Sequence, residues 1–178
     1  RPYQQVPFQW SCHSQSHTGT LKHAEWLADD RGDPRRGFAE SLINLIGPRG
    51  TLLAYNAAFE RKRLEELAEA IPQYADALLD LVDRMVDLLQ ITRDRYYHPD
   101  MRGSWSIKKV LPTIAPELSY QGLSVADGGM AQDAFMALLH TDTAENQKIQ
   151  IRQDLLTYCE RDTFAMVEIA RFFEGKRR

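Results

Sequence analysis

Short segments with strand periodicity alternate along this sequence with longer segments of helical periodicity, and their order is the feature that most constrains the fold. Residues 6–13 alternate apolar and polar side chains with the two-residue period of a strand. Residues 21–27 predict a second strand, and the polar residues 14–20 between them indicate a hairpin loop. Two more strands are expected at residues 51–55 and 84–88, each followed by a helix. The order β-β-α-β-α-β-α-α-α is typical of an α/β fold in which helices cover one mixed sheet.

Capping residues and apolar periodicity predict where the helices lie. Asp33 and Pro34 form an N-cap and a first-turn proline, and the helix that they begin ends near Gly47. A later short helix ends at Leu111, before a proline. The other predicted helices span residues 57–70, 130–139 and 149–173. We expect the following residues in the core: Phe8, Trp10, Leu53, Tyr55, Val86, Leu155, Val167 and Ile169.

The length and composition are those of one globular domain. The chain has 178 residues, of which 43% are hydrophobic and 26% are charged. The first residue is Arg1 and not a methionine, so we expect residues 1–178 to be a single domain cut from a longer protein. The formal net charge of −3 argues against nucleic-acid binding by bulk charge alone. It is compatible with a nuclease, because metal ions bound to carboxylates reverse the local sign of charge.

The sequence carries no membrane or secretion signal. No apolar run approaches the roughly 18 residues that span a bilayer, and the N-terminus does not resemble a signal peptide. Cys12 and Cys159 are too few for a disulfide framework, so both thiols are expected to be reduced. These observations predict a cytoplasmic protein.

The first cluster of chemically active residues follows the predicted strand at residues 51–55. Asn56 stands at the carboxyl end of this strand, and Glu60 follows one helical turn later on the same helix face. Open α/β sheets place their ligands at this edge. The structural alternative is that Asn56 caps the helix and Glu60 is a solvated acid favoured by the helix dipole.

The second cluster lies in the last predicted helix. Tyr158 and Asp162 are four residues apart and therefore share a helix face. A carboxylate beside a phenol can bind a metal ion and orient a water molecule. The structural alternative is a half-buried tyrosine with a surface aspartate near Arg161.

The two clusters together resemble the DEDD 3′–5′ exonucleases of the tyrosine subtype, in the ribonuclease-H-like superfamily. Asn-x-x-Phe-Glu at residues 56–60 is similar to their second motif, which usually ends in Asp where this chain has Glu60. Tyr-x-x-x-Asp at residues 158–162 is similar to their third motif. Asp87 looks like the strand-end aspartate that often follows the second motif. Residues 103–108 and 158–163 more closely resemble a bacterial family described as a domain of unknown function.

The resemblance implies a ribonuclease-H-like mixed sheet flanked by helices, with the first central strand missing from this chain. That strand carries the family's first motif, Asp-x-Glu, and only five residues precede the strand predicted to begin at Val6. The implied activity is 3′–5′ hydrolysis of phosphodiester bonds in DNA or RNA by the intact parent protein. The cofactor would be a pair of Mg²⁺ or Mn²⁺ ions, for which the missing acids are needed. We therefore expect this fragment alone to be inactive.

The resemblance also implies roles for individual residues. Glu60 and Asp162 would bind metal ions or their water molecules, and Tyr158 would orient the attacking water. Asn56 would fix the geometry between strand and helix. Three further residues are expected near the substrate groove, where lysine meets phosphate and tryptophan stacks on a base. They are Ser104, Trp105 and Lys108.

Several alternatives stay open. Glu60 in place of an aspartate favours a non-catalytic module that keeps the fold and binds nucleic acid or protein. If the chain is an exonuclease, its partner is a single-stranded nucleic-acid end. A missing central strand would leave open sheet edges, which predicts a homodimer through a sheet edge. Residues 93–102 interleave tyrosines with arginines, which indicates either a base-stacking surface or a solvated loop. Cys12, His13 and His17 lack the fourth ligand of a zinc site.

Overall fold

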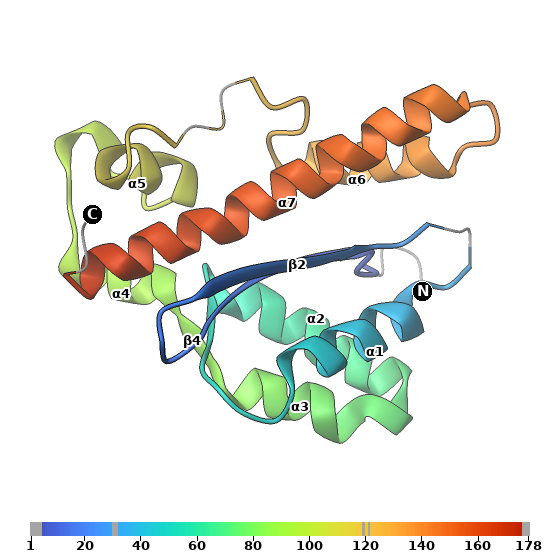
Figure 1. Ribbon diagram of the computed structural model, residues 1–178, viewed down its shortest axis with the longest axis horizontal. Coiled ribbons are helices and arrows are strands. Elements are labelled where there is room, and N and C mark those ends of the chain that lie inside the picture. The colour runs from blue at the N-terminus through green and yellow to red at the C-terminus, as the bar shows by residue number, and fades with distance from the viewer. Residues whose placement is uncertain (1–4, 30–31, 119, 121, 176–178) are drawn as a thin grey trace.

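Helices predominate in the structure, a computed structural model that describes residues 5–29, 32–118, 120 and 122–175 (Figure 1). The chain is an α/β protein with two small sheets, as the sequence predicts in outline. Its main elements are β1 (Gln9–Gln15), β2 (Leu21–Leu27), α1 (Arg35–Ile46), β3 (Leu52–Ala54), α2 (Ala57–Ala70), α3 (Ala75–Asp83), β4 (Met85–Asp87), α4 (Leu88–Arg95), α5 (Ile107–Ile114), α6 (Gly128–Leu139) and α7 (Glu145–Phe173).

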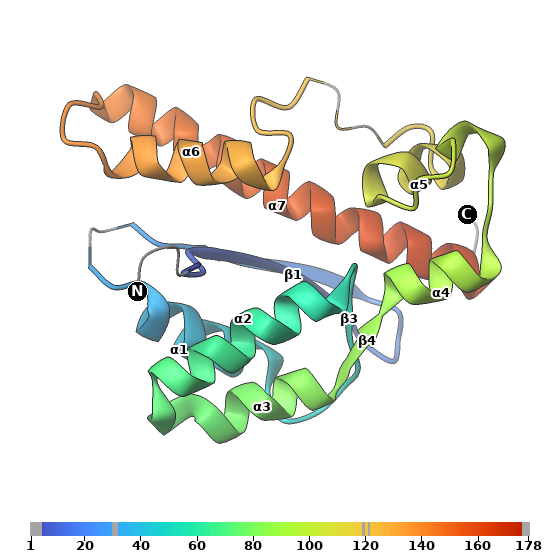
Figure 2. The same ribbon diagram turned by 180° about the vertical axis from the view of Figure 1, so that it is seen from behind.

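Strands β1 and β2 form the predicted antiparallel hairpin. Their register pairs Trp10 with Trp26 and His13 with His23. The hairpin lies between two helical layers, with α7 on one side and α1 to α3 on the other (Figures 1 and 2). β1 begins at Gln9, three residues later than predicted, whereas β2 has the predicted bounds.

Strands β3 and β4 form a second, parallel sheet that is separate from the hairpin. The described strands therefore do not make the single mixed sheet that was expected. Leu53 and Val86 are paired in this small sheet and are 42% and 38% exposed, so the prediction that they are buried is wrong. Both strands nevertheless form. The middle residue of each three-residue strand points to a face that no other layer covers, because neighbouring residues of a strand alternate between faces.

α7 and α6 begin four and two residues earlier than predicted, at Glu145 and Gly128, and the helices differ from the prediction more strongly in two other places. α3 was not predicted, although Leu78 and Leu81 lie three residues apart on the buried face of an amphipathic helix. α5 continues through Pro112 to Ile114 instead of ending at Leu111. Proline lacks the N–H that would bond the carbonyl four residues earlier. The buried Val110 and Leu111 keep this amphipathic helix in place despite the missing hydrogen bond.

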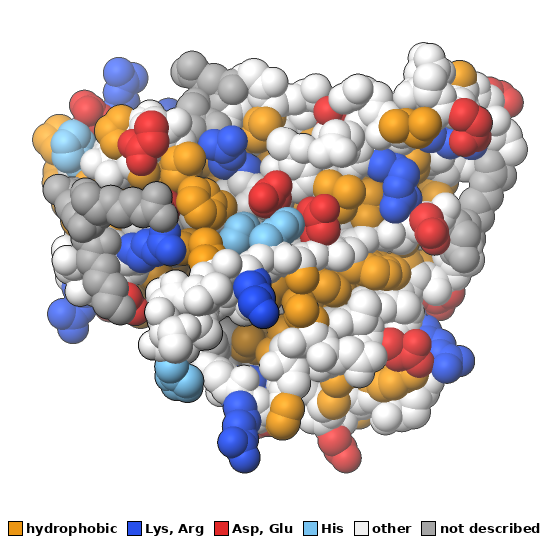
Figure 3. All heavy atoms as spheres, in the orientation of Figure 1, with side chains coloured by type: hydrophobic (Ala, Val, Ile, Leu, Met, Phe, Trp, Pro, Cys, Tyr) orange, Lys and Arg blue, Asp and Glu red, His pale blue; other side chains and the backbone are white. Residues whose placement is uncertain are grey.

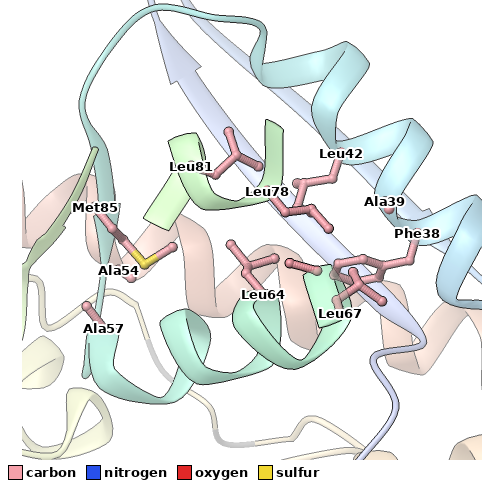
Figure 4. Packing of buried hydrophobic residues seen from close by; sticks show 11 residues of the cluster. Phe38, Ala39, Leu42, Ala54, Ala57, Leu64, Leu67, Leu78, Leu81 and Met85 are labelled. Carbon is pink, nitrogen blue, oxygen red and sulfur yellow. The ribbon is translucent and has the colours of Figure 1, made fainter. Parts of the chain in front are cut away.

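Two regions of buried residues hold the layers together. One lies between α1, α2, α3 and the β3–β4 sheet, where Leu64, Leu78 and Leu81 meet (Figure 4). The other follows α7, where Leu155 and Ile169 are fully buried as predicted. The remaining predicted core residues are partly buried: Phe8, Trp10, Tyr55 and Val167.

Both cysteines are free thiols in the described chain, as the sequence predicts. Burial raises the pKa of Cys12, and burial together with Asp162 and Glu25 raises the pKa of Cys159 to about 12. Neither thiol is therefore an activated nucleophile at neutral pH. Within the described ranges, no helix combines the length and apolar character needed to cross a bilayer.

Two leucines give a matched test of this packing. Leu155→Ala empties a fully buried position beside α6 and should lower the free energy of unfolding by about 2–5 kcal/mol. Leu53→Ala changes a residue that is 42% exposed and should cost less than about 1 kcal/mol. Urea unfolding followed by circular dichroism measures both. Equal losses would mean that the β3–β4 face is covered in solution.

Candidate active site

The turn from β3 into α2 holds Asn56 in a left-handed backbone conformation, with φ 69° and ψ 55°. Asparagine adopts this conformation more readily than most residues, because its short side chain can hydrogen-bond locally. Among the described residues its side chain makes no capping bond to α2, so the structural alternative for Asn56 is wrong in this respect. Its backbone N–H instead donates to Asp87 Oδ1 over 3.1 Å, which ties the turn to the end of β4.

Asp87 ends β4 at the same sheet edge. It is paired in register with Ala54 of β3, and parallel strands present their carboxyl ends on one side. Asp87 Oδ1 also accepts a hydrogen bond of 2.9 Å from the Leu89 N–H and so caps α4. The carboxylate is therefore held in place by backbone groups from two elements.

Glu60 lies in the first turn of α2 and carries a buried carboxyl group. Its Oε2 atom has no hydrogen-bond partner in the part of the chain that the structure describes. Burial, with smaller contributions from the negative charges of Asp87 and Asp162, raises the pKa of Glu60 to about 7. Three carboxylates from α2, β4 and α7 thus lie close enough to interact electrostatically. The solvated role that the structural alternative gives Glu60 does not fit this environment.

Asp162 on α7 is buried and accepts hydrogen bonds from two phenols. Burial raises the pKa of Asp162 above its ordinary value, and hydrogen bonds from Tyr120 and Tyr158 and the charge of Lys108 offset only part of that rise. The Tyr120 hydroxyl donates to Asp162 Oδ1 over 2.7 Å. Tyr158, one helical turn before Asp162, is 9% exposed and also donates to this carboxylate. The structural alternative of a surface aspartate is therefore wrong.

Both phenols are neutral hydrogen-bond donors at physiological pH. Burial and the neighbouring Asp162 charge raise the pKa of Tyr120 and of Tyr158 well above the ordinary value for tyrosine. Because the Tyr158 hydroxyl donates its one hydrogen to Asp162, it can orient a water molecule by accepting a hydrogen bond from that water. A base would require the phenolate, which this site disfavours.

Lys108 of α5 supplies the positive charge next to these groups. Its Nζ atom donates to the Ala126 carbonyl and lies 5.7 Å from the ring centroid of Tyr120 and 5.8 Å from that of Tyr158. Cation–π contacts of this kind stabilise a partly buried ammonium group. Of the three residues predicted near a substrate groove, Lys108 is the one that contacts the Tyr158–Asp162 pair.

Trp105 and Ser104 lie in the loop before α5 and make structural hydrogen bonds. The Trp105 indole N–H donates to the Tyr96 carbonyl over 3.0 Å, and the Trp105 carbonyl accepts from the Tyr55 hydroxyl over 2.7 Å. Ser104 Oγ accepts from the Ser106 N–H over 3.3 Å. These bonds connect the end of β3 to the start of α5, so the loop is anchored to Tyr55, the residue before Asn56.

Two residues of the site, Asp87 and Tyr120, were not among the site residues predicted from the sequence. Asp87 was recognised as a strand-end aspartate, and the shared carboxyl edge of parallel strands is the signal that would have placed it beside Asn56. Tyr120 comes from a loop without periodicity, and only the fold brings it to Asp162. Carboxylate oxygens are the ligands that a hard divalent cation prefers. In the described chain, however, the ligand atoms of Glu60, Asp87 and Asp162 do not all lie within 4.8 Å of one another.

Comparison with known proteins matches residues 1–106 to a family described as Domain of unknown function (DUF2779). An uncharacterized protein of Mycoplasma pneumoniae is 32% identical over 136 residues, covering 70% of this chain and 20% of that protein. An uncharacterized protein of Ureaplasma parvum is 30% identical over 173 residues, covering 86% of this chain and 25% of that protein. The chain thus spans a quarter or less of the length of these curated relatives. No solved structure matches it.

The raised pKa of Glu60 makes stability depend on pH. The folded state favours the protonated Glu60 carboxyl group, whose pKa rises from 4.5 in the unfolded chain to about 7 on folding. Its contribution to the free energy of unfolding is therefore complete only below pH 4.5. That contribution is lost as the pH rises through about 7. We therefore compare the free energies of unfolding of Glu60→Gln and wild type. We expect the difference in favour of Glu60→Gln to be about 2 kcal/mol larger at pH 8 than at pH 5.

Urea unfolding at several pH values between these limits measures this difference. The control is Glu65→Gln, which changes an exposed acid on the same helix and should follow wild type at every pH. A Glu60→Gln effect that is the same at pH 5 and pH 8 would show that this carboxyl group titrates normally.

Proposed function

Because the chain belongs to the family described as Domain of unknown function (DUF2779), whose description names no activity, we propose a function from the site itself. The chain is the exonuclease-like domain of a divalent-metal-dependent enzyme that hydrolyses phosphodiester bonds of DNA or RNA from the 3′ end. One observation carries this proposal: Glu60 has a buried carboxylate oxygen without a hydrogen-bond partner in the described chain, and its pKa also responds to the charges of Asp87 and Asp162 from two other elements.

The donor set fits a hard cation. Mg²⁺ and Mn²⁺ prefer carboxylate oxygens, and a bound cation would satisfy Glu60 Oε2 and relieve the repulsion that raises the Glu60 pKa. Glu60 and Asp162 would be the metal ligands supplied by this chain, and Asp87 would add negative charge at the sheet edge. When bound, a pair of such ions activates a water molecule and stabilises the leaving oxygen.

The other residues position the reacting groups. Tyr158, held neutral beside Asp162, would orient the attacking water through its hydroxyl group. Lys108 would neutralise the phosphate that approaches Asp162. Asn56 fixes the turn that carries Glu60, because its N–H binds Asp87. A single-stranded end would stack on Trp105 and on Tyr97, which is 62% exposed with its ring centroid 6.2 Å from that of Trp105.

The proposal extends to the fold. The β1–β2 hairpin and the β3–β4 pair would be two parts of a ribonuclease-H-like sheet whose first central strand, with its Asp-x-Glu acids, completes the metal site. The separation of the two described sheets and the exposure of Leu53 and Val86 support a vacant position. The domain would then work within a longer protein, in keeping with the length of the curated relatives.

A nuclease assay tests the activity. Residues 1–178 are compared with a longer protein that includes upstream sequence, using 5′-labelled single-stranded DNA and RNA with Mn²⁺. We expect stepwise 3′ shortening by the longer protein and at least about 100-fold slower cleavage by residues 1–178. In the longer protein, Asp162→Asn and Tyr158→Phe should each reduce the rate about 100-fold, whereas Glu65→Gln should not.

The outcomes separate the enzyme from the non-catalytic alternative. Shortening that survives Asp162→Asn would exclude this site as the source of activity. A longer protein that binds the labelled strands without cleaving them would instead identify a binding module in which Glu60 has replaced the functional aspartate.

Open sheet edges give a separate prediction. Unpaired strand groups cost roughly 1–3 kcal/mol each when buried without partners. We expect residues 1–178 alone to form a homodimer through a sheet edge, and the longer protein to be monomeric. Size-exclusion chromatography with light scattering measures both masses. A monomeric form of residues 1–178 would contradict edge pairing between copies.

A further inference from the structure

A second cluster of metal-ligating side chains lies where the β1–β2 hairpin meets α7. His13 and His23 are directly opposed across the hairpin, and their rings stack with centroids 4.6 Å apart. Glu160 comes from α7, with its Oε1 atom 3.8 Å from His23 Nδ1. One ligand atom from each of the three residues lies within 4.8 Å of the other two. Histidine and acidic side chains are seen together at the surface in this region (Figure 3).

Two hydroxyl groups fix the orientation of both imidazole rings. Thr163 Oγ1 lies 2.8 Å from His13 Nδ1 and 2.8 Å from Ser11 Oγ. Ser11 Oγ in turn lies 2.8 Å from His23 Nε2. The Thr163 hydroxyl donates to backbone carbonyls of the preceding α7 turn at 3.3 and 3.2 Å. Its oxygen therefore accepts from Ser11 and from His13.

Counting hydrogens along this chain of bonds gives one consistent set of tautomers when the Thr163 hydrogen is donated to an α7 carbonyl. Ser11 has one hydroxyl hydrogen and donates it to Thr163, so its oxygen accepts from the N–H at His23 Nε2. His13 likewise carries its N–H at Nδ1. The lone pairs that remain are at His13 Nε2 and His23 Nδ1, and the latter is the nitrogen that faces Glu160. In metal sites, the ring nitrogen that does not bind the ion usually donates such a hydrogen bond.

We propose that His13, His23 and Glu160 bind one divalent transition-metal ion, with Zn²⁺ as the favoured ion. Two imidazoles and one carboxylate, with a fourth position open to water, form a common zinc ligand set. Bonds of about 2.0–2.1 Å would bring the ligand atoms to about 3.3 Å apart. Glu160 can make this movement, because its side chain is 53% exposed. Glu25, with Oε2 3.9 Å from His23 Nε2, adds negative charge to the site.

This site differs chemically from the carboxylate cluster. Imidazole nitrogen selects Zn²⁺ and related ions over Mg²⁺, which prefers an all-oxygen set. The bound ion would connect the hairpin to the α7 turn that also carries Asp162. Zn²⁺ should therefore stabilise the folded protein as well as bind to it.

Titration with Zn²⁺ alone, by calorimetry in a buffer that contains millimolar Mg²⁺, tests the site. We expect one Zn²⁺ per chain, an increase in the thermal midpoint on binding, and visible absorption bands when Co²⁺ replaces Zn²⁺. His13→Ala, His23→Ala and Glu160→Gln should each weaken binding at least about 100-fold, and Ser11→Ala about 10–100-fold. The matched control is His140→Ala, which removes an exposed histidine near Asp142 and should leave binding unchanged.

Glu160→Gln alters an exposed side chain, so this variant should fold like wild type. Near-ultraviolet circular dichroism verifies the fold of each variant. Absence of stoichiometric Zn²⁺ binding, or binding that Glu160→Gln and His23→Ala leave unchanged, would overturn the proposal. Binding that Asp162→Asn abolishes and His13→Ala does not would place the ion in the carboxylate cluster, and would also overturn it.

Discussion

The burial of α7 is the constraint on which the rest of the structure depends. This 29-residue helix covers one face of the β1–β2 hairpin and contacts α5 and α6 along its length. Its buried residues Leu155, Tyr158, Ala165 and Ile169 follow steps of three or four, except between Tyr158 and Ala165. Asp162 occupies the position that completes the stripe. Packing the apolar residues of this face therefore carries a carboxylate into the interior.

Asp162 and Glu60, the two acids that are proposed to bind metal, differ in how far neighbouring groups compensate the desolvation of their carboxylates. Two phenols and Lys108 offset part of the desolvation of Asp162, whose pKa is still raised by burial. Glu60 has no comparable donor at its Oε2 atom, and its pKa of about 7 reflects burial beside like charges. A cation from solution would gain more by binding at Glu60 than at a carboxylate already satisfied by the protein. This asymmetry supports metal binding more strongly than the number of acids alone.

Local sequence periodicity predicted the individual strands and helices better than it predicted how the strands assemble into sheets. The two-residue period of the hairpin and the helical stripes depend on neighbouring residues, and these elements formed. Burial of Leu53 and Val86 depended on joining the strands into one sheet, which the described residues do not do. The candidate acids were found from spacing, but Asp162 carried a second signal, a charged residue within an apolar stripe. His13 was considered with Cys12, although adjacent strand residues face opposite sides; its partner His23 becomes visible only through the hairpin register.

One turn of α7 serves both proposed metal sites, on different flanks. Tyr158 and Asp162, four residues apart, face the carboxylate cluster, whereas Glu160 and Thr163, three residues apart, face the histidines. The two sites share no ligand, so their ions would not compete. Any coupling between the two sites would be reciprocal. Zn²⁺ at the histidines would change the affinity of Asp162 for its cation by some factor, and that cation would change the affinity of the histidines for Zn²⁺ by the same factor.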